Sequence, residues 1–151
     1  MKDQFQGDGI VLDNALAFWV HRLYQATRNE TYRGFRKQGI ELTPEQWVVL
    51  VRLWEQDGRA QNELCESTFR DKPTMSRMID SLEKRGIVTR KPLPSDARAR
   101  IVFLTREGKA LKPKLVPVAK DIVERMVEGI DPKALEITRA TLQRMFTNLD
   151  R

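Results

Sequence analysis

Cysteine and histidine are almost absent from this 151-residue sequence, which contains one of each. A single cysteine cannot form a disulfide within the chain, so nothing indicates an oxidising compartment. A single histidine, His21, cannot supply a cluster of imidazole ligands, and it makes a catalytic triad improbable. A Gly-rich phosphate-binding loop and a nucleophile with an adjacent base are also missing. We therefore expect no cofactor, no metal and no enzymatic activity.

Long apolar runs are missing as well, since none approaches the ~20 residues that a membrane-spanning helix needs. Near the N-terminus, Asp8 and Asp13 interrupt any apolar segment of the kind found in signal peptides. The composition, 40% hydrophobic and 32% charged, is typical of a folded domain. We expect a cytoplasmic protein that forms a single domain over residues 1–151 and does not contact membranes.

Positive charge is concentrated in one part of the chain. Residues 70–100 contain nine Lys or Arg against four Asp or Glu, whereas residues 1–69 contain eight against ten. Most of the net charge of +6 therefore comes from about a fifth of the sequence. Such a concentration is expected for a protein that binds a polyanion, although an ordinary solvated surface would give the same count.

Helical signals dominate both ends of the sequence. Apolar residues recur at helical spacing from about residue 11 to 37. A second helix is predicted to begin after Thr43, with Pro44 at its first position and Gln46 completing a capping box. The expected buried residues of this helix are Trp47, Leu50, Val51 and Trp54. Further helices are predicted after Thr105 and from Asp131-Pro132, the first of them bent or interrupted by Pro113 and Pro117.

The middle of the chain predicts two short helices followed by a hairpin. One helix covers about residues 61–68, with Leu64 and Cys65 inward, and the next begins after Asp71. An apolar stripe of this second helix, at i, i+3, i+4 and i+7, comprises Met75, Met78, Ile79 and Leu82. Two strands, residues 88–91 and 101–104, then enclose a basic loop. This order is that of a winged helix-turn-helix, so the predicted class is mainly α with a small β-hairpin wing.

The second helix of such a pair enters the major groove of DNA. Its apolar stripe faces the protein, so the first two turns are expected to contact DNA through Lys72, Pro73, Thr74, Ser76 and Arg77. Hydroxyl groups and free backbone N–H groups at a helix N-terminus suit phosphate oxygens, and arginine can bind guanine with two hydrogen bonds. The predicted loop adds Arg98 and Arg100, which suit the minor groove. Asp96 either orients Arg98 or only forms the turn.

Taken together, five segments resemble the DNA-binding core of the MarR family (multiple antibiotic resistance regulators). They are LTPEQW at 42–47, DKPTMSR at 71–77, LEKRGIV at 82–88, SDAR at 95–98 and VFLTREGKAL at 102–111. The resemblance implies a homodimer on a pseudo-palindromic operator, with recognition-helix contacts by Thr74, Ser76 and Arg77 and a wing arginine at Arg98. Ala97 stands where many family members have a second basic residue.

The same resemblance implies a small aromatic or phenolic effector. Trp19, Tyr24, Arg28 and Trp47 are candidates to bind it, although plain core packing would also account for the aromatic residues. A redox role for Cys65 is disfavoured by its inward position and by Glu63 and Glu66 nearby. Dimerisation is also indicated without the resemblance, because residues 11–40 and 105–151 have apolar stripes that the module of residues 41–104 covers only in part.

The sequence therefore predicts a sequence-specific, double-stranded-DNA-binding transcription regulator, most often a repressor in this family. A non-specific architectural DNA-binding protein and a winged-helix scaffold that binds another protein remain as alternatives. The operator, the target genes and the effector are not encoded in any recognisable pattern.

Overall fold

The structure is a computed structural model that describes residues 5–6, 9–93 and 96–150, with side chains for residues 9, 11–92 and 100–150. Its elements are β1 (Phe5–Gln6), β2 (Gly9–Ile10), α1 (Leu16–Lys37), α2 (Pro44–Glu55), β3 (Arg59–Ala60), α3 (Gln61–Thr68), α4 (Lys72–Lys84), β4 (Val88–Leu93), β5 (Asp96–Leu104), α5 (Arg106–Met126) and α6 (Pro132–Leu149). The predicted class, mainly α with a β-hairpin wing, is confirmed. Within this described part, no helix is long and apolar enough to cross a membrane.

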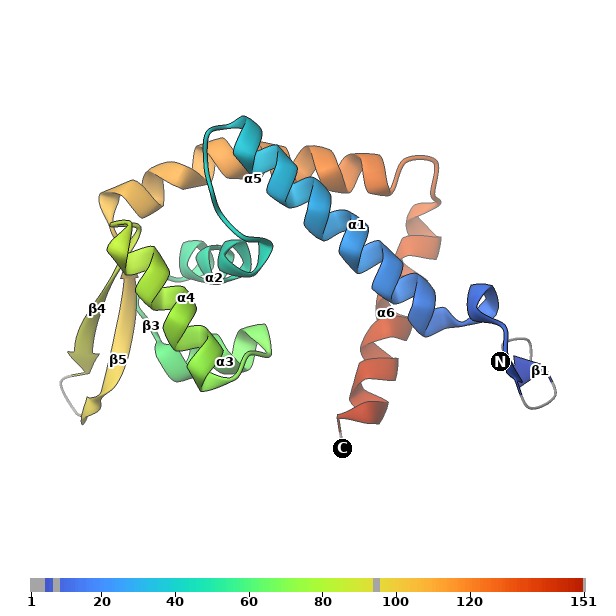
Figure 1. The fold of residues 1–151 in the computed structure, drawn as a ribbon, viewed down its shortest axis with the longest axis horizontal. Helices are drawn as coiled ribbons and strands as arrows, with labels where there is room; N and C mark the ends of the chain where they lie inside the picture. Colours follow the sequence, from blue (N-terminus) through green and yellow to red (C-terminus); the bar gives the residue numbers. More distant parts are fainter. Residues whose placement is uncertain (1–4, 7–8, 94–95, 151) are drawn as a thin grey trace.

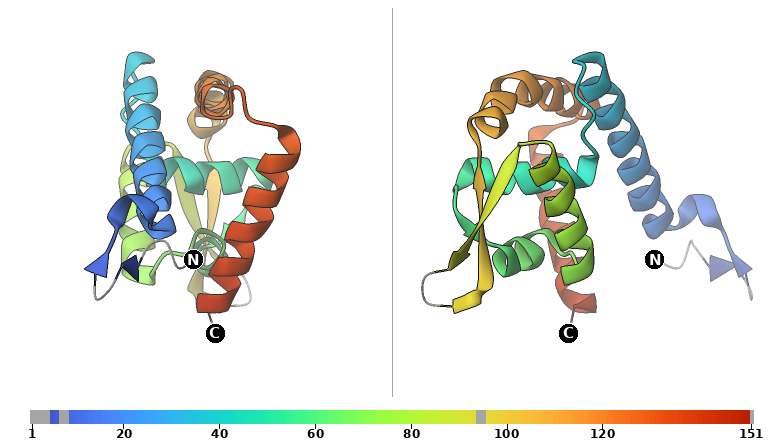
Figure 2. Two further views of the ribbon diagram at one scale, coloured as in Figure 1. Left: turned by 90° about the vertical axis from the view of Figure 1, so that its right-hand side faces the viewer. Right: turned by 60° about the vertical axis from the view of Figure 1, so that its left-hand side comes forward.

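The helices form two groups (Figure 1). Helices α2, α3 and α4 gather around the small sheet at one end of the molecule. Helix α5 runs from this module to the other end, where α6 turns back beside α1. Viewed along α5, helices α1 and α6 stand on either side of it (Figure 2, left). The chain is therefore an elongated frame in which α1, α5 and α6 extend beyond the module.

Helix starts follow the local signals of the sequence. The Thr43 hydroxyl accepts a hydrogen bond from the Gln46 backbone N–H, and the Gln46 side chain accepts one from the Thr43 N–H, both at 3.1 Å. Asp71 caps α4 and Thr105 caps α5 in the same way. Each cap satisfies backbone donors that have no partner inside the helix, and this is why the predicted starts are confirmed.

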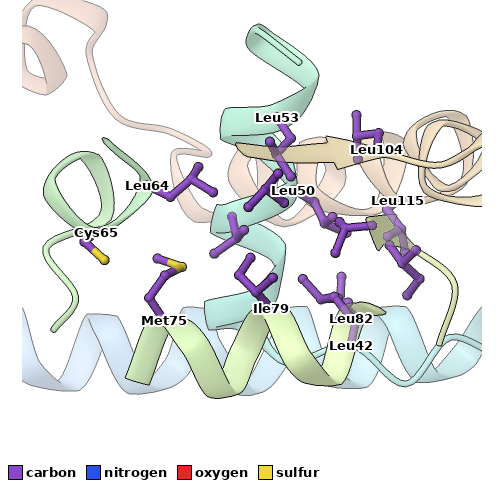
Figure 3. Close-up of a cluster of buried hydrophobic side chains, with 14 of the residues drawn as sticks. Leu42, Leu50, Leu53, Leu64, Cys65, Met75, Ile79, Leu82, Leu104 and Leu115 are labelled. Carbon is purple, nitrogen blue, oxygen red and sulfur yellow. The ribbon is translucent and has the colours of Figure 1, made fainter. Parts of the chain in front are cut away.

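The core lies between α2, α4 and the sheet (Figure 3). Leu50 and Leu53 of α2 face Met75, Ile79 and Leu82 of α4, and all five are buried. The remaining members come from most of the other elements and are Phe35, Leu42, Val49, Leu64, Cys65, Ile87, Val88, Val102, Leu104 and Leu115. No residue of α6 belongs to this core. The core therefore includes the inner face of α4 and excludes α6.

The predicted buried face of α2 is partly wrong. Leu50 is buried, but Trp47, Val51 and Trp54 are only half-buried, and Val49 and Leu53 take the inner positions. The indole rings of Trp47 and Trp54 pack against the margin of the core instead. Trp47 lies 5.2 Å from the ring centroid of Phe35 and 5.4 Å from that of Trp54. At that margin the indole N–H of Trp54 can donate a hydrogen bond to the Gly108 carbonyl, at 3.1 Å.

The sequence predicts that the prolines of α5 bend or interrupt this helix, and α5 is not interrupted, because it continues through both of them. Pro113 and Pro117 each remove one backbone donor, which leaves the carbonyl four residues earlier without its helical partner. Both prolines lie on the exposed side of α5. Water can hydrogen-bond to the carbonyls there, and this lowers the cost of keeping the helix continuous.

The wing, which we define as the β4–β5 hairpin, is longer than predicted. Strands β4 and β5 extend over residues 88–93 and 96–104, so most of the expected loop is strand, including positions 98 and 100. A register shift at Pro92/Leu93 absorbs the irregular pairing near its end. The two-residue strand β3, too short to show a periodicity, pairs with β5 and completes an order of β3-β5-β4.

Candidate nucleic-acid interface

Helix α4 presents the predicted DNA-contact residues on its outer face. Lys72, Pro73 and Arg77 are exposed, and Thr74 and Ser76 are half-buried beside them. Helix α3 precedes α4 through a tight turn in which Phe69 adopts a left-handed conformation, with φ of 53°. The first turns of α4 and the outer ends of β4 and β5 lie on the same side of the module (Figures 1 and 2).

The N-terminus of α4 is already occupied by a carboxylate. Asp71 accepts a hydrogen bond from the Thr74 N–H at 2.8 Å, and this bond lowers the pKa of Asp71. A DNA phosphate therefore cannot bind the Thr74 N–H while Asp71 accepts its hydrogen bond. One backbone donor that was expected to bind phosphate is thus already used. Among the side-chain donors nearby is Arg77, whose guanidinium lies 3.4 Å from the Thr74 hydroxyl.

The predicted wing residues are described in part. Arg100 is exposed on β5, where it pairs in register with Pro92. The backbone of Asp96 and Arg98 belongs to β5, and their side chains lie outside the part that the structure describes. The sequence analysis placed these residues in a loop, whereas the structure places residues 96–100 in strand β5.

Arg90 joins α4 to the wing, and the sequence analysis did not identify it as a site residue. Its guanidinium donates hydrogen bonds to Asp80 and, at 2.7 and 3.0 Å, to Glu83, both on α4. The Arg90 backbone N–H also donates to Glu83, at 2.8 Å. The hydrogen bond from Arg90 lowers the pKa of Glu83 against the opposing effect of burial. Asp80 and Glu83 therefore pair with a strand residue and fix the angle between α4 and the hairpin.

A signal for this contact was present in the strand pattern. Val88 and Arg90 are two residues apart, so they point to the same face of β4. Their partners in β5 are Leu104 and Val102, both buried. A charged residue at an inward position needs a partner, and Asp80 and Glu83 are acidic residues one turn apart on the adjacent helix.

We expect Arg90→Met to lower the affinity for specific DNA more than the matched variant Lys91→Met. Both variants remove one positive charge from β4, but Lys91 is exposed, with its ammonium 5.4 Å from the centroid of the Phe103 ring. The Arg90 contacts are partly solvated, so the expected loss of stability is about 1 kcal/mol. Fluorescence anisotropy with labelled duplex and urea unfolding measure the two effects. Equal losses of affinity in both variants would show that Arg90 acts only through its charge.

A cavity of about 250 Å³ lies between α1, the start of α2 and the α3–α4 turn. It brings together three of the four predicted effector residues, Tyr24, Arg28 and Trp47. Trp19 is not among the lining residues and donates its indole N–H to the Asp13 carbonyl at 2.7 Å instead. The remaining lining residues are Thr27, Thr31, Pro44, Glu45, Val48 and Arg70. We call this the α1–α2 cavity.

Inside the α1–α2 cavity, Arg28 forms an ion pair with Glu45. The Arg28 Nε lies 3.0 Å from a Glu45 carboxylate oxygen, and the Tyr24 hydroxyl donates to the same oxygen at 3.4 Å. Burial alone would raise the pKa of Glu45, but hydrogen bonds from its own backbone N–H, Arg28 and Thr43 lower it below its usual value. Glu45 is therefore a carboxylate at neutral pH.

Helices α1 and α6 expose a continuous apolar face. Its members are Leu16, Val20, Tyr24, Leu142, Met145, Phe146 and Leu149, which border an open groove of about 460 Å³ together with Ala17 and His21. Helix α6 has no buried residue at all. A described contact of α6 with the module is that between Phe146 and Phe69, whose ring centroids lie 5.0 Å apart.

Cys65 is buried in α3, as predicted. Burial raises the pKa of its thiol, and the nearby Lys72 offsets this only in part. Among the residues that the structure describes, no group of His, Cys, Asp and Glu could hold a metal ion.

Comparison with known proteins agrees with this arrangement. The family model described as MarR family matches residues 42–99. The organic hydroperoxide resistance transcriptional regulator of Bacillus subtilis (strain 168) is 30% identical over 145 residues, covering 94% of this chain and 95% of that protein. A probable transcriptional regulator from Pseudomonas aeruginosa is 30% identical with a TM-score of 0.80, over 89% of this chain and 99% of that one.

A second solved structure shares the fold at lower identity. CouR from Rhodococcus jostii RHA1, bound to p-coumaroyl-CoA, is 24% identical with a TM-score of 0.78, over 89% of this chain and 94% of that one. The matched region 42–99 spans the module from the start of α2 into the wing. Fold, motif order and full-length similarity agree, and the chain belongs to the MarR family of DNA-binding transcription regulators.

Proposed function

We propose that this protein is a homodimeric repressor that binds a pseudo-palindromic operator, with α4 in the major groove and the wing in the minor groove. The observation that supports this proposal best is that the first turns of α4 and the outer end of the wing lie on the same side of the module (Figure 1). Arg90 of the wing holds the two elements together through its hydrogen bonds to Glu83 of α4. A helix and an arginine-bearing hairpin on one side of a module match adjacent grooves of one duplex. Repression follows physically where a bound dimer covers promoter sequence.

The proposed division of the chain assigns residues 41–104 to DNA binding and residues 11–40 and 105–151 to dimerisation. The apolar face of α1 and α6 supports this division, because a monomer would expose it to water. A twofold dimer would cover the face and present two copies of α4. Two half-sites about one helical turn apart would then be read together.

We further propose that the α1–α2 cavity binds a small aromatic effector that modulates DNA binding. CouR shows that a protein of this fold binds a ligand with an aromatic acyl group. The cavity volume of about 250 Å³ lies just below the usual range for pockets that bind drug-sized ligands. A single aromatic ring suits this size better than a complete coenzyme A thioester.

Oxidant sensing, which the name of the Bacillus subtilis relative suggests for that protein, is a weaker proposal for this chain. Cys65 is the only cysteine in the sequence. It is buried, and its raised pKa keeps it in the thiol form, whereas the thiolate is the species that reacts with peroxides. We therefore propose control by a bound ligand.

Selection of bound fragments from a random DNA pool tests the proposed function. We expect Arg77→Ala to lower the affinity for the selected duplex by about 1–3 kcal/mol and to relax the sequence preference at one position. Lys72→Ala should weaken selected and random duplexes alike, because a lysine–phosphate contact is independent of sequence. Anisotropy titrations over a range of salt concentrations measure both variants.

The alternatives give different results in the same experiment. Similar affinities for selected and random duplexes would identify an architectural DNA-binding protein. No binding at low salt would point to a scaffold that binds protein. An unchanged preference in Arg77→Ala would contradict the assignment of Arg77 to base recognition.

A further inference from the structure

Phe69 ends α3 at a position where glycine is the usual residue. The Phe69 N–H donates a hydrogen bond to the Glu66 carbonyl at 3.3 Å, and the Arg70 N–H donates one to the Cys65 carbonyl at 2.9 Å. This pair of hydrogen bonds requires a left-handed residue at the end of the helix, and Phe69 has a φ of 53°. Among the residues that the structure describes, Phe69 is the one non-glycine residue with a positive φ. A Cβ makes this conformation unfavourable, so the backbone alone would favour glycine here.

The Phe69 side chain gains little from the core of its own chain. It is 74% exposed and does not belong to the cluster of buried residues. Its ring packs edge-on against that of Phe146 in α6, with the ring centroids 5.0 Å apart and the ring planes at 66°. Such an edge-to-face contact is a favourable arrangement of two aromatic rings. What a phenylalanine adds at this position is therefore a contact with α6.

This contact joins α6 to the turn that precedes α4. Helix α6 has no buried residue and contributes nothing to the core. The C-terminal part of α6 lies at the level of α3 (Figure 1). The turn that contains Phe69 leads directly into α4, whose N-terminal cap is Asp71. The Phe69–Phe146 contact therefore connects α6 to the start of the helix that we assign to the major groove.

We propose that Phe69 is a positioning residue, whose ring packs against Phe146 and sets the placement of α4 relative to α6. In a twofold dimer the same placement is repeated in both subunits, so it determines the distance and rotation between the two copies of α4. One base pair changes the spacing of two half-sites by about 3.4 Å along the DNA axis and about 35° around it. Phe69 therefore contributes to the choice of half-site spacing. This positioning role rests on the proposed function, because it requires α6 in the dimer and α4 on the DNA.

The unfavourable backbone conformation of Phe69 agrees with this role. Glycine would fit the turn better but has no ring to place against Phe146. A strained residue that the rest of the fold does not require is typical of a position selected for function. Asparagine, which tolerates the left-handed region, would also satisfy the turn without making the contact.

Anisotropy titrations of the full chain with two duplexes test the proposed role. One duplex carries two half-sites at the spacing found by selection from a random pool, and the other has one base pair inserted between them. We expect the unmodified chain to bind the lengthened duplex at least about tenfold more weakly, because both half-sites can no longer be occupied together without strain. Phe69→Gly should reduce this difference to about threefold or less, because α4 then has more than one placement relative to α6.

Phe69→Tyr is the matched control, since it keeps the aromatic ring and the left-handed Cβ. It should retain the difference of about tenfold between the two duplexes. Phe146→Leu should reduce the difference as Phe69→Gly does, and combining the two changes should reduce it no further, because both remove one contact. Sedimentation velocity checks that each variant is still a dimer.

Urea unfolding separates positioning from a purely structural role. The Phe69→Gly midpoint should equal or exceed that of the unmodified chain, because glycine relieves the backbone strain and the lost ring is outside the core. A lower midpoint together with an unchanged preference for spacing would show that Phe69 only stabilises the turn, and the positioning role would be wrong.

The remaining outcomes separate this role from the proposed function. If the unmodified chain distinguishes the two duplexes and Phe69→Gly distinguishes them equally well, the positioning role is wrong and the proposed function stands. Loss of the distinction in Phe69→Tyr would also overturn it, because the ring would then not be the cause. If the unmodified chain binds both duplexes alike, binding to paired half-sites is itself contradicted, and the positioning role falls with it.

Discussion

Gly108→Ala is expected to lower the free energy of unfolding by about 3 kcal/mol or more, which is a large share of the stability of a domain of this size. Gly108 lies in the first turn of α5, where an added Cβ would be 2.1 Å from the carbonyl oxygen of Ile87. That separation is far below van der Waals contact. The expected loss already includes the gain of roughly 1 kcal/mol that alanine brings to a helix.

The oxygen that meets this Cβ cannot easily move away. It accepts hydrogen bonds from the backbone N–H and the hydroxyl of Thr105, at 3.1 and 3.0 Å. Gly108 itself donates to the Thr105 hydroxyl and accepts from Trp54. Relief of the overlap would therefore disturb the cap of α5 and its contact with α2 together.

Urea unfolding followed by circular dichroism measures the effect, with Lys112→Ala as the control. Lys112 is on the exposed side of the same helix, so its replacement should change the midpoint little. A Gly108→Ala midpoint equal to that of the control would show that α5 shifts freely against the sheet. The close approach would then contribute nothing to stability.

Local signals explain why much of the fold could be predicted. The starts of α2, α4, α5 and α6 depend on hydrogen bonds within four residues of Thr43, Asp71, Thr105 and Asp131. The same holds for the apolar stripe of α4, whose members Met75, Ile79 and Leu82 are buried as expected. These features require no knowledge of distant residues.

Features that depend on distant partners were missed or placed wrongly. The inner face of α2 is decided by how the helix packs against the rest of the core, where Leu53 is buried and Trp54 is half-buried. The extent of the wing is decided by pairing between β4 and β5 rather than by either strand alone. Arg90 is the clearest case, because its two acidic partners lie seven and ten residues away on another element.

The candidate site was predicted in its location rather than in its contacts. The sequence indicated the outer face of α4, and Lys72, Pro73 and Arg77 do lie exposed there. It also placed Asp71 at the start of this helix, but it did not predict the consequence that the Asp71 carboxylate takes the Thr74 N–H, a donor expected to be free for phosphate. The sequence also pointed to Arg28 but not to Arg70. Arg70 lies in the turn between α3 and α4, far from α1 in the sequence, and only the fold brings both arginines to the α1–α2 cavity.

Leu142→Glu combined with Met145→Glu in α6 is expected to convert the protein to a monomer and to lower operator affinity about 100-fold. Both residues belong to the exposed apolar face, and neither is buried in its own chain. Two glutamates in a dimer interface would lose hydration without gaining partners. The affinity falls because, in a monomer, binding of one α4 to its half-site no longer positions a second α4 at the other half-site.

Gln143→Glu is the control, since it adds one negative charge to the same exposed turn at a residue that does not line the groove. Sedimentation velocity measures the oligomeric state, and anisotropy measures binding to duplexes with one or two half-sites. The double variant should keep its helical circular dichroism, because α6 contributes no residue to the core. It should also bind the single half-site as the unmodified chain does. A double variant that stays dimeric would show that the apolar face of α6 lies outside the subunit interface, and the assignment of residues 105–151 to dimerisation would fail.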